Sequence, residues 1–217
     1  MAKRFLDLFV VFVATLLFLP FLLPIAILLR FTGEGEVFYK QKRIGKFNQP
    51  FLIWKFATML KNSPNMGTAD VTLKNDPRVL PMGNFLRKTK INELPQIINV
   101  WNGTMSVVGA RPLMQRSFDL YSDDVRKVIY NTPPGITGIG SLVFRDEESL
   151  IDKSGQDPLK FYEETILPYK GKLEQWYQAN QSFWTDIKII FLTAWVILFP
   201  KSELVYKWFQ DLPKRSF

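Results

Sequence analysis

A single glutamate lies close to several basic side chains near the middle of the chain. Glu93 follows Arg87, Lys88 and Lys90, and Asn92 precedes it directly. Arginine and lysine bind phosphate oxygens, and a carboxylate beside them can hold a divalent metal ion. The cluster therefore indicates a site for phosphates and a metal.

The same residues also have a purely structural explanation. Residues 93–101 predict a helix with Pro95 in its first turn, which places Asn92 at or near the N-cap and Glu93 at the favoured end of the macrodipole. The apolar face of this helix consists of Leu94, Ile97, Ile98 and Trp101. From these residues alone, capping and phosphate binding both stay open.

The residue types that are missing restrict the chemistry. The 217 residues include no cysteine and no histidine, so catalysis must use carboxylates, Lys, Arg, Tyr or hydroxyl groups, and a metal would be Mg²⁺ or Mn²⁺. A net charge of +8 suits nucleic acid, acidic lipid headgroups or phosphate-bearing substrates. The aromatic and apolar stretches near both ends favour a membrane surface, and no base-reading motif supports nucleic-acid binding.

The elements that must position this cluster begin with an apolar segment at residues 5–29. As a straight helix it would be about 37 Å long, enough to cross a bilayer core of about 30 Å. Pro20 and Pro24 should bend or break such a helix, and basic residues flank it on both sides. We therefore expect a helix-break-helix element with its break at Pro20. A single transmembrane anchor is the open alternative.

The rest of the chain is expected to form one domain, so that residues 1–32 are the membrane element and residues 33–217 the catalytic domain. Residues 36–40 and 51–56 predict a hairpin with its turn at 45–50, and residues 61–77 predict a loop. Residues 157–177 predict an amphipathic helix interrupted near Pro168, and 183–199 an interfacial or a core helix. The acids within 145–148 are expected to be solvated.

A series of short motifs in a fixed order resembles the monotopic phosphoglycosyl transferases, a family of bacterial sugar transferases. The resemblance covers residues 3 to about 145. Its motifs are Lys-Arg-x-x-Asp at 3–7, Leu-Pro at 19–20, Gln-x-Arg-x-Gly at 41–45, Lys-Phe-Ala-Thr-Met at 55–59, Asp-Pro-Arg at 76–78, Arg-Lys-Thr at 87–89, Asn-Glu-Leu-Pro-Gln at 92–96, Met-Ser at 105–106, Gly-Ala-Arg-Pro at 109–112, Pro-Gly-Ile-Thr-Gly at 134–138, and Arg145.

This resemblance implies a mostly helical α+β fold: a monotopic membrane protein with a re-entrant N-terminal helix and amphipathic interfacial helices, on the cytoplasmic face of the bacterial inner membrane. It implies transfer of a sugar 1-phosphate from a UDP-sugar to undecaprenyl phosphate, with Mg²⁺ or Mn²⁺, as the first membrane step of exopolysaccharide, capsule or glycoprotein glycan synthesis. The expected partners are these two substrates and membrane lipids, without nucleic acid, and a homodimer is left open. Glu93 would bind the metal, and the phosphate-binding residues would be Lys55, Arg87, Arg111 and Arg145.

Asn92 stands where the family has a nucleophilic aspartate. A carboxamide is not a useful nucleophile, so the family's aspartyl intermediate cannot simply form at this position. Three explanations stay open: Glu93 is the nucleophile, the lipid phosphate attacks directly while Glu93 holds the metal, or the chain is catalytically impaired. In the last case it would act as a membrane scaffold that binds lipid or nucleotide-sugar.

Overall fold

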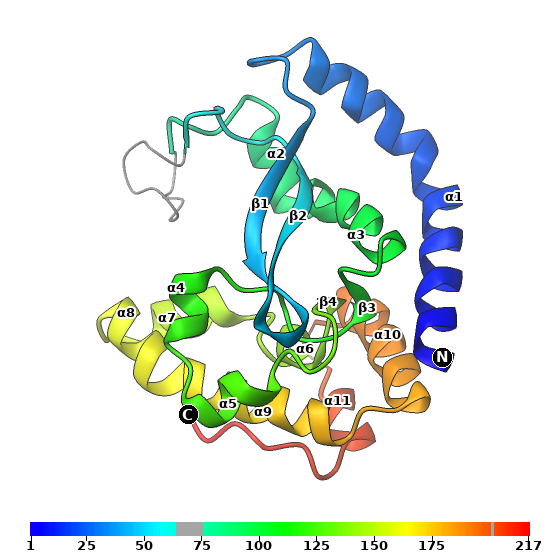
Figure 1. The fold of residues 1–217 in the computed structure, drawn as a ribbon. Helices are drawn as coiled ribbons and strands as arrows, with labels where there is room; N and C mark the ends of the chain where they lie inside the picture. Colours follow the sequence, from blue (N-terminus) through cyan, green and yellow to red (C-terminus); the bar gives the residue numbers. More distant parts are fainter. Residues whose placement is uncertain (64–75, 201) are drawn as a thin grey trace.

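The computed structural model describes residues 1–63, 76–200 and 202–217 (Figure 1). Most of the predicted loop at 61–77 therefore lies outside the described residues. The N-terminal elements are α1 (Ala2–Arg30), β1 (Phe38–Ile44), β2 (Pro50–Phe56), α2 (Gly83–Lys88), the 3-10 helix η3 (Ile91–Gln96) and α3 (Ile97–Trp101). The remaining elements are β3 (Ser106–Val108), α4 (Gln115–Asp119), α5 (Asp123–Val128), β4 (Gly135–Thr137), α6 (Ile139–Val143), α7 (Glu147–Ser154), α8 (Pro158–Phe161), a π-helical turn (Tyr162–Ile166), α9 (Leu167–Ala179), α10 (Phe183–Leu198) and α11 (Leu204–Trp208).

The apolar N-terminal segment forms one helix, α1, which continues through Pro20 and Pro24. Figure 1 shows that α1 changes direction along its length, so the helix bends without the expected break. Among the described helices it is the one long and apolar enough to cross a membrane. Most of its large side chains are exposed, among them Phe12, Leu16, Leu17 and Phe21.

Both ends of α1 nevertheless pack on the same domain. Val11 is buried in the main core cluster, and Leu29 is buried with Phe56 and Leu86. In the first turns of α1, the ammonium of Lys3 forms a 2.8 Å ion pair with Asp186 of α10, and Asp7 accepts a hydrogen bond from the Ser106 hydroxyl at 2.8 Å. Each end of α1 thus has one side packed on the domain, while large apolar side chains are exposed along its whole length, from Phe5 to Leu28.

The predicted hairpin is confirmed. Strands β1 and β2 pair antiparallel, with Tyr39 opposite Lys55, and a 3-10 turn at Lys46–Asn48 connects them. Because side chains alternate along a strand, Tyr39, Gln41 and Arg43 share one face of β1. That face borders the cavity described below.

The helix predicted at 93–101 differs from the expectation at its start. The chain is a 3-10 helix from Ile91 to Gln96 and becomes α-helical only at Ile97. Pro95 cannot donate a backbone hydrogen bond, which disfavours regular α-helix at this point. The N-cap is Lys90, with a φ of 62°, and Asn92 lies inside the 3-10 turn. Asn92 is therefore near the N-cap, two residues after it, and not at it.

The main core lies between β3, α6, α9 and α10. Strands β3 and β4 pair in parallel, and the fully buried side chains include Ile139, Leu173, Tyr177, Ile189 and Leu192. Burial of each such aliphatic side chain stabilises the fold by roughly 1.5–3 kcal/mol.

The C-terminal half refines two expectations and corrects a third. Pro168 lies in the first turn of α9 and does not interrupt it; the departure from α-helix is the preceding π-helical turn. Helix α10 is both a core and a surface helix, because Ile189 is buried while Trp184 is 69% exposed. In the acidic run, Asp146 pairs with Arg215 and Glu147 pairs with Lys170, so neither is simply solvated.

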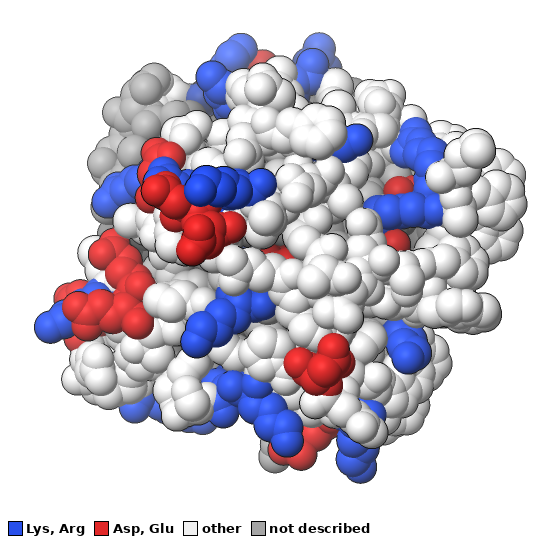
Figure 2. Space-filling view, turned by 60° about the horizontal axis from the view of Figure 1, so that its bottom comes forward, with Lys and Arg blue, Asp and Glu red and all other residues white. Residues whose placement is uncertain are grey.

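The surface charge is distributed over the domain. Figure 2 shows a face on which Lys and Arg are interspersed with Asp and Glu. A denser group of cationic side chains surrounds Glu93, at the cavity between the hairpin and η3.

Candidate functional site

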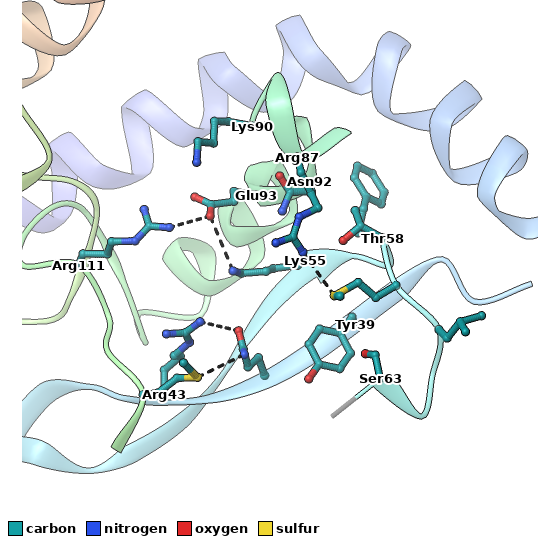
Figure 3. Close-up of a pocket in the computed structure, with 15 residues that line it drawn as sticks. Tyr39, Arg43, Lys55, Thr58, Ser63, Arg87, Lys90, Asn92, Glu93 and Arg111 are labelled. Carbon is teal, nitrogen blue, oxygen red and sulfur yellow. Dashed lines mark hydrogen bonds and ion pairs between the residues drawn. The ribbon is translucent and has the colours of Figure 1, made fainter. Parts of the chain in front are cut away.

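Most of the predicted site residues meet at one polar cavity of about 280 Å³ (Figure 3). The hairpin supplies one wall, η3 and the end of α2 supply another, and the segment after β3 closes a third side. The predicted residues that line it are Lys55, Arg87, Asn92, Glu93 and Arg111. The sequence thus predicted a cluster that the fold brings together from three separate segments.

Glu93 lies at the centre of the charged groups. Its Oε1 is 2.8 Å from an Arg111 guanidinium nitrogen and 3.7 Å from the Lys55 ammonium. Burial alone would raise the pKa of Glu93, but Arg111, Lys55 and Lys90 outweigh burial and lower that pKa to about 2. Glu93 is therefore a permanent carboxylate at neutral pH.

For Lys55, burial has a larger effect on the pKa than the neighbouring opposite charge has. Its side chain is 16% exposed, and burial lowers its pKa to about 8 although Glu93 favours the charged form. Arg43, Arg111 and Arg87 add to the lowering. The cavity thus has an excess of positive charge around one carboxylate, as expected for a site that accepts a multiply charged anion.

Asn92 is beside Glu93 and lacks the partners that a structural amide has. The residue is 8% exposed, and its Oδ1 is buried without a hydrogen-bond partner among the described residues. A buried carbonyl oxygen without a partner lowers the stability of the fold, so Asn92 Oδ1 is a candidate to bind a ligand. Asn99 shows the contrast, because it accepts a hydrogen bond from Trp54 N at 2.9 Å and donates one to Leu52 O at 2.7 Å, which fixes α3 to β2.

Two oxygen donors, the Glu93 carboxylate and Asn92 Oδ1, are available to a hard cation here. No group of three or more acidic, histidine or cysteine side chains occurs in the described part of the chain. Mg²⁺ commonly binds through one or two carboxylates together with substrate phosphates. The residues present therefore fit a Mg²⁺ that arrives with, or is completed by, a phosphate-bearing substrate.

Three residues differ from the expectation. Arg145 is exposed on the segment between α6 and α7 and does not line this cavity. Tyr39 and Gln41 do line it, although the sequence analysis gave them no role. Their alternation with Arg43 along β1, opposite Lys55, is the pattern that could have identified them.

Tyr130 holds the segment that carries Arg111. Its buried hydroxyl donates to Arg111 O at 2.7 Å and accepts from Leu113 N at 2.9 Å. We expect Tyr130→Phe to lower stability by about 1–3 kcal/mol because two buried backbone groups lose their partner. As Tyr130 is a positioning residue, the KM for the anionic substrate should rise more than kcat falls.

Steady-state kinetics and thermal melting measure these two effects separately. Tyr206→Phe is the matched control, because its hydroxyl contacts Tyr169, away from the cavity. An unchanged KM in Tyr130→Phe would show that the hydroxyl only stabilises the fold.

Two features thus characterise the class of protein: a helix long and apolar enough to cross a membrane, and a cavity in which cationic side chains surround one carboxylate. A family model described as bacterial sugar transferase matches residues 1–200. The chain belongs to that family.

Three relatives show what the family contains. The exopolysaccharide production protein ExoY of Rhizobium meliloti is 34% identical over 208 residues, which cover 89% of this chain and 84% of ExoY. The UDP-glucose:undecaprenyl-phosphate glucose-1-phosphate transferase of Escherichia coli is 34% identical over 195 residues, and the UDP-galactose-lipid carrier transferase of Erwinia amylovora is 32% identical over 213. The matches cover 88% and 90% of this chain, but only 39% and 40% of those longer proteins.

Proposed function

We propose that this protein transfers a sugar 1-phosphate from a UDP-sugar to undecaprenyl phosphate, the first membrane step in the synthesis of exopolysaccharide, capsule or a glycoprotein glycan. The observation that carries the proposal is the Glu93 carboxylate in a cavity with many cationic side chains. These cations are Arg43, Lys55, Arg87, Lys90 and Arg111. They match the diphosphate of a nucleotide-sugar, and the names of the relatives supply the donor and the lipid acceptor.

The net reaction is a displacement at the sugar-bearing phosphorus. An oxygen of the lipid phosphate forms a bond to this phosphorus, the bond to the bridging oxygen breaks, and UMP leaves with that oxygen and its electron pair. The role of Arg111, Lys55 and Arg87 is to bind the phosphate oxygens and stabilise charge on the leaving group.

Two routes to this product use Glu93 differently. In the first, Glu93 attacks the phosphorus and holds the phosphosugar as an acyl phosphate until the lipid phosphate takes it. In the second, the lipid phosphate attacks directly and Glu93 binds Mg²⁺, with Asn92 Oδ1 as a further donor. Bound Mg²⁺ would neutralise phosphate charge. Covalent trapping of a radiolabelled phosphosugar on the protein separates the two routes.

The membrane arrangement that fits this chemistry is a re-entrant α1 on the cytoplasmic face of the bacterial inner membrane, where UDP-sugars are available. Both ends of α1 pack on one domain, through Lys3 and Val11 at one end and Leu29 at the other. A helix whose two ends return to the same domain fits an element that enters and leaves by one face. Labelling of single cysteines placed at both ends, from either side of the membrane, tests this topology.

The test of function is UMP release from a panel of UDP-sugars with undecaprenyl phosphate and Mg²⁺, using the full chain in bilayers. We expect release with at least one sugar. Absence of release that Asn92→Asp restores would instead identify a catalytically impaired family member that binds without turnover. Absence of both release and UDP-sugar binding would refute the proposal.

A further inference from the structure

A second cavity, of about 290 Å³, borders the first one. The two cavities share Lys90 and Arg111, so any group that these cations bind has access to both. The other walls of the second cavity come from α6, α7, the π-helical turn and α9. Figure 1 shows α7 on the opposite side of the molecule from α1.

Glu174 of α9 is the unexplained residue of this second cavity. It is 6% exposed, and its Oε2 is buried without a hydrogen-bond partner among the described residues. The Gly140 N–H donates to the carboxyl, and a Cβ at position 140 would come within 2.5 Å of Oε1. Burial raises the pKa of Glu174 to about 7, so the group is poised to donate as well as accept a hydrogen bond.

The cavity combines polar groups with aromatic walls. The Lys170 ammonium pairs with Glu147 at 2.6 Å and lies 5.0 Å from the ring centre of Phe144 and 5.4 Å from that of Tyr162. The Ser141 hydroxyl lines the same space. Hydroxyl groups of a ligand would meet carboxyl and hydroxyl partners here, while its apolar face would meet aromatic rings.

We propose that the second cavity binds the sugar ring of the nucleotide-sugar, and that Glu174 and Ser141 recognise its hydroxyl groups. The inference rests on the proposed function. With the diphosphate at Arg111 and Lys90, which line both cavities, the uridine and the sugar of the donor must occupy different cavities. A cavity with two carboxyl groups suits a ring of hydroxyl donors better than it suits uracil, which offers only a single N–H donor. Glu174 is then a specificity residue, and the sugar transferred depends on it.

The experiment is calorimetric titration of the full chain in nanodiscs with UMP, UDP and a panel of UDP-sugars that includes pairs of epimers. Glu174→Gln should weaken binding of the preferred UDP-sugar by about tenfold and change the order of affinities among epimeric UDP-sugars. The reason is that a site that hydrogen-bonds a particular hydroxyl distinguishes epimers through that bond. UDP and UMP affinities should stay within about twofold. Glu163→Gln, an exposed glutamate just before α9, is the matched control.

Three outcomes overturn the inference. If Glu174→Gln weakens the binding of UDP and of UDP-sugar equally, the uridine occupies this cavity. If the affinities and their order are unchanged, Glu174 is a structural residue. If the unmodified chain binds no UDP-sugar, the proposed function fails as well. Should Glu174→Gln lower the melting temperature strongly, Ser141→Ala is the second variant, with the same selective loss expected for UDP-sugars.

Discussion

Replacing Glu93 with glutamine is expected to reduce UMP release by about 1000-fold, since the change removes the charge while keeping the size of the side chain. Glu93 is the carboxylate that Arg111 and Lys55 approach at 2.8 and 3.7 Å in this cavity. As nucleophile or as metal ligand, it must be ionised, and glutamine can do neither task well. Both routes therefore predict a large loss.

A single-turnover assay with radiolabelled donor measures the effect on the chemical step. UDP-sugar binding should fall much less than the rate, because the Arg111 guanidinium stays charged in the variant and the carboxylate that would face the diphosphate is removed. Glu163→Gln provides the matched control at an exposed glutamate. A Glu93→Gln protein that retains more than a tenth of the rate would exclude Glu93 from both roles.

The second large effect concerns stability. Asp186 is 1% exposed and accepts hydrogen bonds from Lys3 Nζ and from the Tyr177 hydroxyl, both at 2.8 Å. Asp186→Ala would leave the Lys3 ammonium without its counterion, and breaking a buried pair in this way costs about 3–5 kcal/mol. For a domain of this size, we expect the melting temperature to fall by roughly 10 °C.

Thermal melting in one detergent compares Asp186→Ala with two controls. Asp123→Ala removes an exposed carboxylate that pairs with Arg126 three residues later, and should change stability by less than about 1 kcal/mol. The double variant Lys3→Met, Asp186→Leu should regain much of the loss, because two apolar groups need no ion pair. A melting temperature within 1 °C of the unmodified protein in Asp186→Ala would contradict the expectation.

The parts of the site that could be predicted are those that depend on patterns within a short stretch of sequence. The alternation on either side of residues 45–50 was enough to predict the hairpin, and the spacing of Arg87 and Glu93 was enough to predict the cavity wall that α2 and η3 form. Local capping preferences predicted Asn92 only as a residue at or near the N-cap. The structure instead has a 3-10 turn after Lys90, and neighbouring elements bury the amide.

Other features depend on contacts between distant segments. Strands β3 and β4 have three residues each and pair across 26 intervening residues, from 109 to 134, so neither has a pattern long enough to predict it. Glu174 looked like an ordinary charged residue on an amphipathic helix. Only the packing of α6 against α9 shows that it is buried next to Gly140.

The attachment of α1 at both ends has a consequence for engineering the protein. Exchanging α1 for an unrelated apolar helix would keep an apolar segment but would leave Asp186 without Lys3 and the Ser106 hydroxyl without Asp7. Deleting residues 1–30 to obtain a water-soluble enzyme would do the same and would also uncover the apolar surface that Val11 and Leu29 pack against. The exposed side chains in the middle of the helix are interchangeable in this respect, whereas Lys3 and Asp7 in its first turns bond to buried groups of the domain.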